Sequence, residues 1–143
     1  MMYKILIADD NAANVELLDT YLTECDYDIV TATAADGAET LEKVKEFQPD
    51  LILLDIMMPK LSGFEVCENL RANPATKDIM ILMVSALSEL GDIDRAVKAG
   101  CDDYLSKPVK RYELLKRVGN LLKLRSVSDE LERLRQYINE MEK

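Results

Sequence analysis

Five side chains that together could carry out phosphoryl chemistry each stand at the end of a short apolar run. They are three aspartates, a serine and a lysine: Asp9, Asp10, Asp55, Ser85 and Lys107. If the runs are parallel strands, their carboxyl ends meet at one edge of one sheet and gather the five side chains there. Carboxylate oxygens suit Mg²⁺, and a hydroxyl and an ammonium can hold phosphoryl oxygens. The sequence therefore predicts a site for a divalent cation and a phosphoryl group.

The runs that must position these residues have the length and composition of strands. They span Tyr3–Ala8, Asp28–Thr33, Leu51–Leu54, Ile79–Val84 and Asp103–Leu105. The third and fourth are almost wholly apolar rather than alternating, which is typical of strands covered on both faces. Apolar residues at helical spacing lie between the runs, over Asn11–Cys25, Asp36–Phe47, Gly63–Arg71 and Asp92–Ala99. This alternation predicts an α/β fold, a parallel sheet with helices on both faces.

For five such units we predict the flavodoxin-like, doubly wound strand order 2-1-3-4-5. In that order the first and third strands are neighbours where the winding reverses, so the acid pair Asp9 and Asp10 faces Asp55 across the crevice. Ser85, on the fourth strand, lies beside Asp55. Lys107 follows the fifth strand and reaches the same point with its long side chain.

Local signals mark the ends of several elements. Asp36 is the predicted N-cap of its helix, with Glu39 at the capping-box position. Gly100 is a good C-terminal stop for the helix before it. We also predict a cis peptide bond between Lys107 and Pro108, because an X-Pro bond adopts the cis form at a cost of only about 0.5–1 kcal/mol.

Composition narrows the setting. The 143 residues are enough for one domain with a core on both faces of a sheet. The net charge of −9 opposes direct nucleic-acid binding by this domain, and the lack of histidine argues against a zinc site or a histidine base. Cys25, Cys67 and Cys101 are odd in number and widely spaced, as reduced packing cysteines are. With neither a membrane-spanning stretch nor a signal peptide, we expect a cytoplasmic protein without membrane contact.

Each candidate residue also has an ordinary structural role that it could fill. An acid pair such as Asp9 and Asp10 is commonly a helix cap, and Asp55 could cap its own loop. Ser85 could be a simple strand exit, and Lys107 could belong to a surface turn. Their joint occurrence at the ends of four predicted strands favours the functional interpretation.

From Tyr3 to Leu124 the chain resembles the receiver domain of bacterial two-component response regulators. The matching motifs, in chain order, are Asp9-Asp10, Asp36-Gly37-Ala38-Glu39, the stretch from Pro49 to Pro59 around Asp55, Gly63-Phe64-Glu65, Ser85-Ala86, the stretch from Ala99 to Leu105, and Lys107-Pro108. Cys101 replaces the alanine usual in its stretch, a change that concerns packing.

The resemblance assigns roles to these residues. It implies that Asp55 is the phosphoacceptor and that Mg²⁺ is organised by Asp9, Asp10, Asp55 and the carbonyl oxygen of Met57. It implies further that Ser85 and Lys107 hold the phosphoryl oxygens. On activation the Ser85 hydroxyl would move, and Tyr104 would rotate into the space that this movement vacates near Ala86.

The lifetime of the phosphoryl group is a further expectation from the resemblance. In similar receivers, the residues two positions beyond the phosphoacceptor and two beyond the serine border the path of the attacking water. Here these residues are Met57 and Leu87. Both are apolar and cannot orient a water molecule by hydrogen bonding, so we expect slow loss of phosphate.

Beyond Leu124 a heptad pattern continues to the end of the chain. Apolar residues recur at alternating intervals of four and three: Val127, Leu131, Leu134, Ile138 and Met141. Glu130 and Arg135 are placed as a g-to-e′ pair for a parallel dimer. Because the pattern is shorter than the three to four heptads typical of a coiled coil, an amphipathic helix packed on its own domain is the alternative.

We therefore divide the chain into a receiver domain, residues 1–124, and a helical extension or linker, residues 125–143. Similar receivers carry such a helix into an output domain. The chain is then either a piece of a longer regulator or a stand-alone receiver that forms a homodimer through its tail.

The expected function is that of a receiver which accepts a phosphoryl group on Asp55 from a sensor histidine kinase or a phosphotransfer protein. It would catalyse only its own phosphorylation and dephosphorylation. One alternative is an Asp-nucleophile phosphatase, although those enzymes carry a second Asp where this chain has Met57. The others are a flavin-type binder on the same scaffold and a receiver-like dimerisation module that is not phosphorylated.

Overall fold

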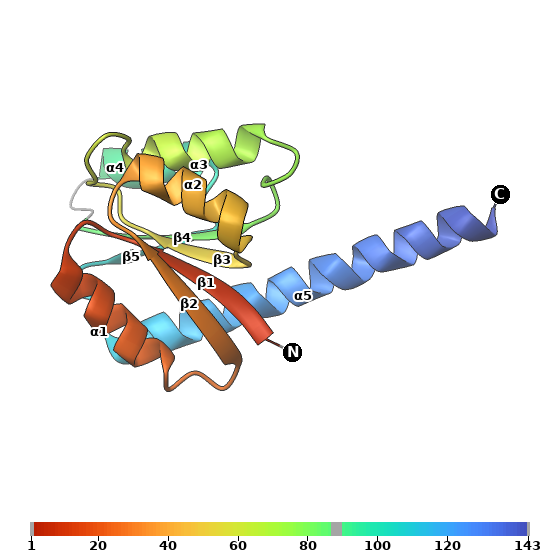
Figure 1. Cartoon of the computed structure of the whole chain (residues 1–143), viewed down its shortest axis with the longest axis horizontal. Helices are drawn as coiled ribbons and strands as arrows, with labels where there is room; N and C mark the ends of the chain where they lie inside the picture. The colour runs from red at the N-terminus through yellow and green to blue at the C-terminus, as the bar shows by residue number, and fades with distance from the viewer. Residues whose placement is uncertain (1, 87–89, 143) are drawn as a thin grey trace.

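The computed structural model describes residues 2–86 and 90–142 (Figure 1). Five strands form one parallel sheet in the order β2-β1-β3-β4-β5, which confirms the predicted topology. The elements are β1 (Met2–Ala8), α1 (Ala12–Leu22), β2 (Asp28–Ala34), α2 (Gly37–Phe47), β3 (Leu51–Leu54), α3 (Gly63–Ala72), β4 (Met80–Ser85), α4 (Leu90–Ala99), β5 (Asp103–Ser106) and α5 (Arg111–Met141).

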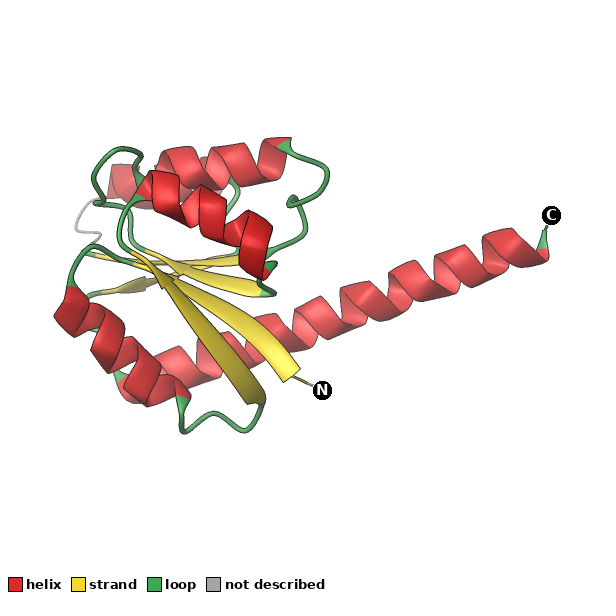
Figure 2. Cartoon of the chain, in the orientation of Figure 1, coloured by secondary structure: helices red, strands yellow, loops and turns green. Residues whose placement is uncertain are grey.

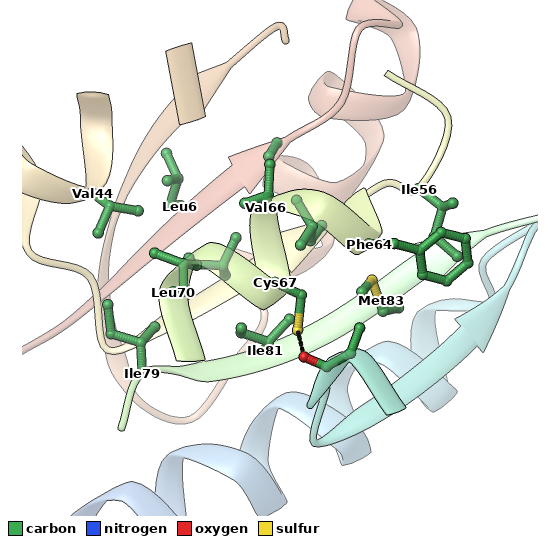
Figure 3. Close-up of a cluster of buried hydrophobic side chains, with 14 of the residues drawn as sticks. Leu6, Val44, Ile56, Phe64, Val66, Cys67, Leu70, Ile79, Ile81 and Met83 are labelled. Carbon is green, nitrogen blue, oxygen red and sulfur yellow. Dashed lines mark hydrogen bonds between the residues drawn. The ribbon is translucent and has the colours of Figure 1, made fainter. Parts of the chain in front are cut away.

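Helices cover both faces of the sheet, as the apolar central runs predicted. Helices α2, α3 and α4 lie on one face, and α1 and α5 lie on the other (Figure 2). Every residue of β3 and β4 is buried. One core cluster packs Phe64 and Val66 of α3 against the sheet (Figure 3), and the second packs Leu18 of α1 and Leu114 of α5 on the other side. The two clusters together bury both faces of the sheet whose strand ends carry the predicted site residues.

Several boundaries differ from the predicted ones for local reasons. Strand β4 begins at Met80 rather than Ile79, because the Ile79 N–H donates to the Thr76 carbonyl in a turn. Helix α1 ends at Leu22 rather than Cys25, since the Cys25 N–H reaches back only three residues, to the Leu22 carbonyl.

The helix caps were predicted in part. Asp36 is the N-cap of α2 and accepts from the Glu39 N–H, as predicted. The Glu39 carboxylate, however, accepts from the N–H of Ala35 rather than that of Asp36, so the capping box is not closed. A closed capping box, absent from the predictions above, starts α3 between Ser62 and Glu65.

Helix α5 is one continuous helix that extends beyond the sheet. It lies along one face of the sheet and then projects past the edge at which β1 begins (Figure 1). Its buried residues are Leu114, Val118, Leu121 and Leu122, whereas the heptad residues beyond them are exposed. These exposed heptad residues form an apolar stripe that is not packed on its own domain. The alternative of an amphipathic helix packed on its own domain is therefore wrong.

Polar contacts fix α5 where it leaves the sheet. The Tyr3 hydroxyl of β1 hydrogen-bonds the Ser126 hydroxyl. The Arg125 guanidinium donates to the carbonyl of Asp78 at 3.0 Å and lies 3.6 Å from the carboxylate of Asp50.

Among the described residues, no helix combines the length and the apolarity needed to cross a membrane.

Candidate functional site

The parallel register brings the predicted acids together. Ala8 of β1 pairs with Leu54 of β3, so Asp9 and Asp55 are the next residues of two neighbouring strands. The Asp55 N–H donates to the Ala8 carbonyl at 2.9 Å and continues the ladder by one step. Carboxylate oxygens of Asp9, Asp10 and Asp55 lie within 4.8 Å of one another. The predicted cluster of three acids is therefore present.

The acids differ in their exposure. Asp9 and Asp55 are 3% and 5% exposed, whereas Asp10 faces solvent. The Asn11 N–H donates to one Asp9 oxygen at 2.9 Å, and the Met57 N–H donates to one Asp55 oxygen at 3.2 Å. These backbone donors fix the two buried carboxylates, while Asp10 leaves the site open to solvent.

Lys107 and Ser85 both reach the acids. The Lys107 ammonium lies 2.9 Å from an Asp9 oxygen and 3.3 Å from an Asp55 oxygen. The Ser85 hydroxyl, itself 3% exposed, donates to the other Asp55 oxygen at 3.0 Å. The Lys107–Pro108 peptide bond is cis, as predicted. Side chains from the ends of three other strands, β1, β4 and β5, thus converge on Asp55.

The charges at this site shift the pKa values of two groups. Burial raises the pKa of Asp55, the Lys107 ammonium lowers it and the Asp9 carboxylate raises it, with a net rise. Burial lowers the pKa of Lys107, but the hydrogen bond to Asp9 and the charge of Asp55 outweigh burial, and the net shift is upward. The ammonium is therefore held charged beside a carboxylate whose ionisation is disfavoured without further positive charge.

The donor set fits a magnesium ion. Mg²⁺ takes oxygen ligands, keeps several waters and is commonly bound through one or two carboxylates. Two buried carboxylates and one exposed carboxylate within 4.8 Å supply such oxygens, and the raised pKa of Asp55 is a cost that a cation would relieve.

Gly63 supports the site, although only the resemblance pointed to it. A Cβ at this position would lie 2.5 Å from the Asp55 carbonyl oxygen, so no larger residue fits there without displacing the backbone. The Gly63 N–H donates to the Ile56 carbonyl at 2.9 Å. The start of α3 therefore packs directly on the backbone that carries Asp55.

The residues predicted to switch or to tune lifetime lie around this core. Ala86 is exposed, and Tyr104 is partly buried on β5, where it pairs in register with Met83 and packs against the core on the α3 side. The Met57 side chain is 76% exposed. Leu87, the second residue expected to border the water path, lies outside the described residues.

Comparison with known proteins identifies the family. The model of the response regulator receiver domain matches residues 5–119, and the chain belongs to this family. It is 40% identical over 131 residues to the response regulator PleD of Caulobacter vibrioides, across 92% of this chain and 28% of that protein. It is 42% identical over 122 residues to the DNA-binding dual master transcriptional regulator RpaA of Synechocystis, across 85% of this chain and 50% of RpaA.

Solved structures give the same family. A signal receiver domain of a histidine kinase from Syntrophus aciditrophicus is 31% identical with a TM-score of 0.78, over 85% of this chain and 90% of that one. The chemotaxis response regulator CheY4 of Vibrio cholerae is 29% identical with a TM-score of 0.75, over 85% of this chain and 99% of that one. Against the longer curated relatives, the chain spans only half the length or less.

Proposed function

We propose that this receiver accepts a phosphoryl group on Asp55 from a sensor histidine kinase or a phosphotransfer protein, in a reaction that depends on Mg²⁺. The observation that carries the proposal is the convergence of Lys107 and Ser85 on the two oxygens of one buried carboxylate, beside two further acids. A structural ion pair would need neither the hydroxyl nor the extra acids. The proposed place of work is the cytoplasm, where such donors present their phosphoryl groups.

The chemistry follows from the charges. An Asp55 oxygen attacks the phosphorus of the donor phosphoramidate, the new O–P bond forms, the P–N bond breaks, and its electron pair stays on the donor nitrogen. Lys107 neutralises charge on the transferring oxygens and holds them in line. Bound Mg²⁺, held by Asp9, Asp10, Asp55 and the Met57 carbonyl, would supply further positive charge to the same oxygens.

The new phosphoryl group then changes the contacts of Ser85. Its hydroxyl donates to Asp55 before the reaction and is free to meet a phosphoryl oxygen after it. That movement vacates space near Ala86, into which Tyr104 rotates. A local change of charge thereby changes the surface formed by α4, β5 and α5.

Helix α5 is the proposed route to the output. It begins four residues after Lys107 and ends far beyond the sheet. Its last buried residue is Leu122, which supports a division into a receiver, residues 1–124, and a helical extension, residues 125–143. The extension would form a homodimer through its exposed stripe, or lead into an output domain in a longer chain.

Incubation with Mg²⁺ and acetyl phosphate tests the phosphoacceptor function. We expect intact-mass measurement to show one added phosphoryl group, lost on treatment with hydroxylamine and absent when EDTA replaces Mg²⁺. A chain that never gains the group would overturn the proposal. Steady turnover of a generic phosphomonoester would instead support the phosphatase alternative, which the receiver family already disfavours.

Asp10→Ala should weaken Mg²⁺ binding by about tenfold or more, since loss of even an outer-shell partner commonly costs 10–100-fold. It should also slow phosphorylation and leave the fold intact, because Asp10 is exposed and its removal relieves repulsion among the acids. Calorimetric titration with Mg²⁺ measures the affinity. The matched control is Glu16→Ala, because Glu16 is an exposed acid that lines a surface groove together with Asp9 and Asp10. Unchanged affinity in Asp10→Ala would remove Asp10 from the proposed metal site.

Met57→Asn combined with Leu87→Glu should speed loss of the phosphoryl group several-fold. The Met57 side chain is exposed at the rim of the site and offers water no hydrogen bond, whereas an amide and a carboxylate can orient the attacking water. Phosphate release from purified phosphoprotein measures the decay. Val97→Asn, also exposed but on α4, is the control. Equal decay in the double variant and the wild type would refute the role given to the water path.

A further inference from the structure

The two faces of α5 carry different kinds of residue. With Leu124 and Leu131 at position a of the heptad and Val127 and Leu134 at position d, the a and d side chains form an exposed stripe. From Val118 onward, the residues with printed contacts to the receiver fall at other positions: Val118, Leu121, Leu122, Arg125 and Ser126 lie at b, e, f, b and c. The stripe therefore stays open to a partner, although Leu131 borders a groove that it shares with Lys77 and Asp78 of the receiver and is still 54% exposed.

A groove on α5 has the lining of a coiled-coil hole. It has a volume of about 430 Å³ and is lined by Asn120, Lys123, Leu124 and Val127. These are successive d, g, a and d positions, which are the four that receive one knob from a facing helix. Leu124 lines this groove two residues after the buried Leu122, so the first layer of the stripe lies next to the buried part of α5 and not only in the projecting tail.

Charge complementarity decides the direction of the second helix. In a parallel pair Glu130 at g lies beside Arg135 at e of the partner, and the two-fold axis makes this contact twice. An antiparallel pair with Leu124 opposite Met141 also matches a with d, but it brings Glu130 beside Tyr137 and Arg135 beside Ser128. The antiparallel arrangement has no attractive charge pair in this segment.

On the N-terminal side of Leu124, the a and d positions of α5 are polar, so the apolar stripe does not extend further in that direction. The preceding a position is Arg117, whose guanidinium pairs at 2.8 Å with Asp103 of its own chain. Asn120 occupies the d position between Arg117 and Leu124. Neither residue offers an apolar knob, so apolar contact between two helices begins at Leu124.

We propose that a second copy of this chain packs along α5 as a parallel two-fold pair whose first apolar layer is Leu124, with the two receiver domains on the outside. The inference rests on the proposed dimer, argues its parallel direction against the antiparallel one and adds its starting layer. The first apolar layer, at Leu124, lies beside Leu122, the last buried residue of α5. The contact between the two helices would therefore begin directly where the packing of α5 on its own receiver ends.

Disulfide cross-linking of Leu124→Cys tests the proposal. In a parallel pair position 124 meets its own copy, so mild oxidation should give a covalent dimer joined at 124 to 124, mapped by peptide mass. The exposed Glu132→Cys, at an outer b position, should give no such dimer. The wild-type chain controls for the native cysteines, of which Cys67 is buried with its pKa raised to about 12.

A mixture of the Leu124→Cys and Met141→Cys variants distinguishes parallel from antiparallel pairing. Homotypic links only are expected, and a dominant link from 124 to 141 would overturn the parallel direction. Linkage of Leu131→Cys but not of Leu124→Cys would overturn the starting layer. Chains that stay monomeric by light scattering, with and without acetyl phosphate, would overturn the dimer itself, whereas phosphorylation of Asp55 is measured independently by mass.

Discussion

The Asp55→Asn variant is expected to gain no phosphoryl group from acetyl phosphate and Mg²⁺ under conditions in which the wild-type chain gains one. An amide oxygen lacks the charge with which a carboxylate attacks phosphorus. The surrounding contacts survive the change, because the Ser85 hydroxyl can donate to the amide oxygen and Lys107 keeps its contact with Asp9. Loss of labelling would therefore show that Asp55 is the nucleophile, because the structure of the site is kept in the variant.

The same substitution should raise the free energy of unfolding of the metal-free protein near neutral pH. The pKa of Asp55 is raised in the folded state, chiefly by burial, so the folded state binds this proton more tightly than the unfolded chain does. The wild-type protein consequently loses stability as the pH rises from the ordinary aspartate pKa through the raised one. Asparagine does not ionise, so the variant should lack this loss. Denaturant unfolding over a pH series measures the difference.

A matched substitution separates the site from general charge effects. Asp94→Asn removes the same charge from an exposed position on α4 and should leave both labelling and the pH dependence of stability as in the wild type. Equal labelling of Asp55→Asn and the wild type would remove Asp55 from the mechanism. Lower stability of Asp55→Asn would show that the ion pair with Lys107 outweighs burial.

The candidate site could be predicted because its members are tied to strand ends. Asp9 and Asp55 each follow an apolar strand directly, and the parallel order makes those strands neighbours. Ser85 closes β4, which lies beside β3. Once the order is fixed, the chain has little freedom to place these side chains elsewhere. The apolar pattern of the strands and the strand order are together sufficient to predict that Asp9, Asp55 and Ser85 lie close to one another.

Contacts among loops could not be predicted in this way. The Arg71 guanidinium donates to the carbonyls of Gly100, Lys77 and Ile79 and pairs with Asp102 at 2.8 Å. Periodicity places Arg71 at the end of α3 but gives no information on which loops approach it. The contacts of Arg125 with Asp50 and Asp78 have the same character, since they join segments that only the finished fold brings together.

The position of the site relative to the extension constrains how a signal could be passed. The acids lie at the carboxyl ends of the strands, whereas α5 leaves the sheet where β1 begins (Figure 1). Helix α5 starts beside Lys107 and passes the whole length of the sheet before the exposed stripe begins. A change at the proposed phosphoryl site would therefore have one continuous helix through which to alter the proposed pairing of two chains. The proposed pairing requires that the exposed stripe hold the two helices together.

Leu131→Lys with Leu134→Lys is expected to abolish dimerisation without affecting phosphorylation of Asp55. The two leucines are 54% and 53% exposed in the single chain. Burying a leucine side chain fully contributes about 1.5–3 kcal/mol, so loss of four leucines from a short two-fold contact removes much of its stability. Lysines at these a and d positions would also face like charges across the axis. Light scattering measures the mass, and intact-mass measurement follows labelling.

A control variant with the same added charge isolates the stripe. Gln136→Lys with Asn139→Lys adds two positive charges at exposed f and b positions of the same helical segment and should leave the dimer in place. If the leucine variant is monomeric and the control is dimeric, association depends on the apolar stripe and not on net charge. A dimer that persists after both leucines are replaced would place the contact on the receiver surface, and α5 would then have to act on an output domain as a single helix.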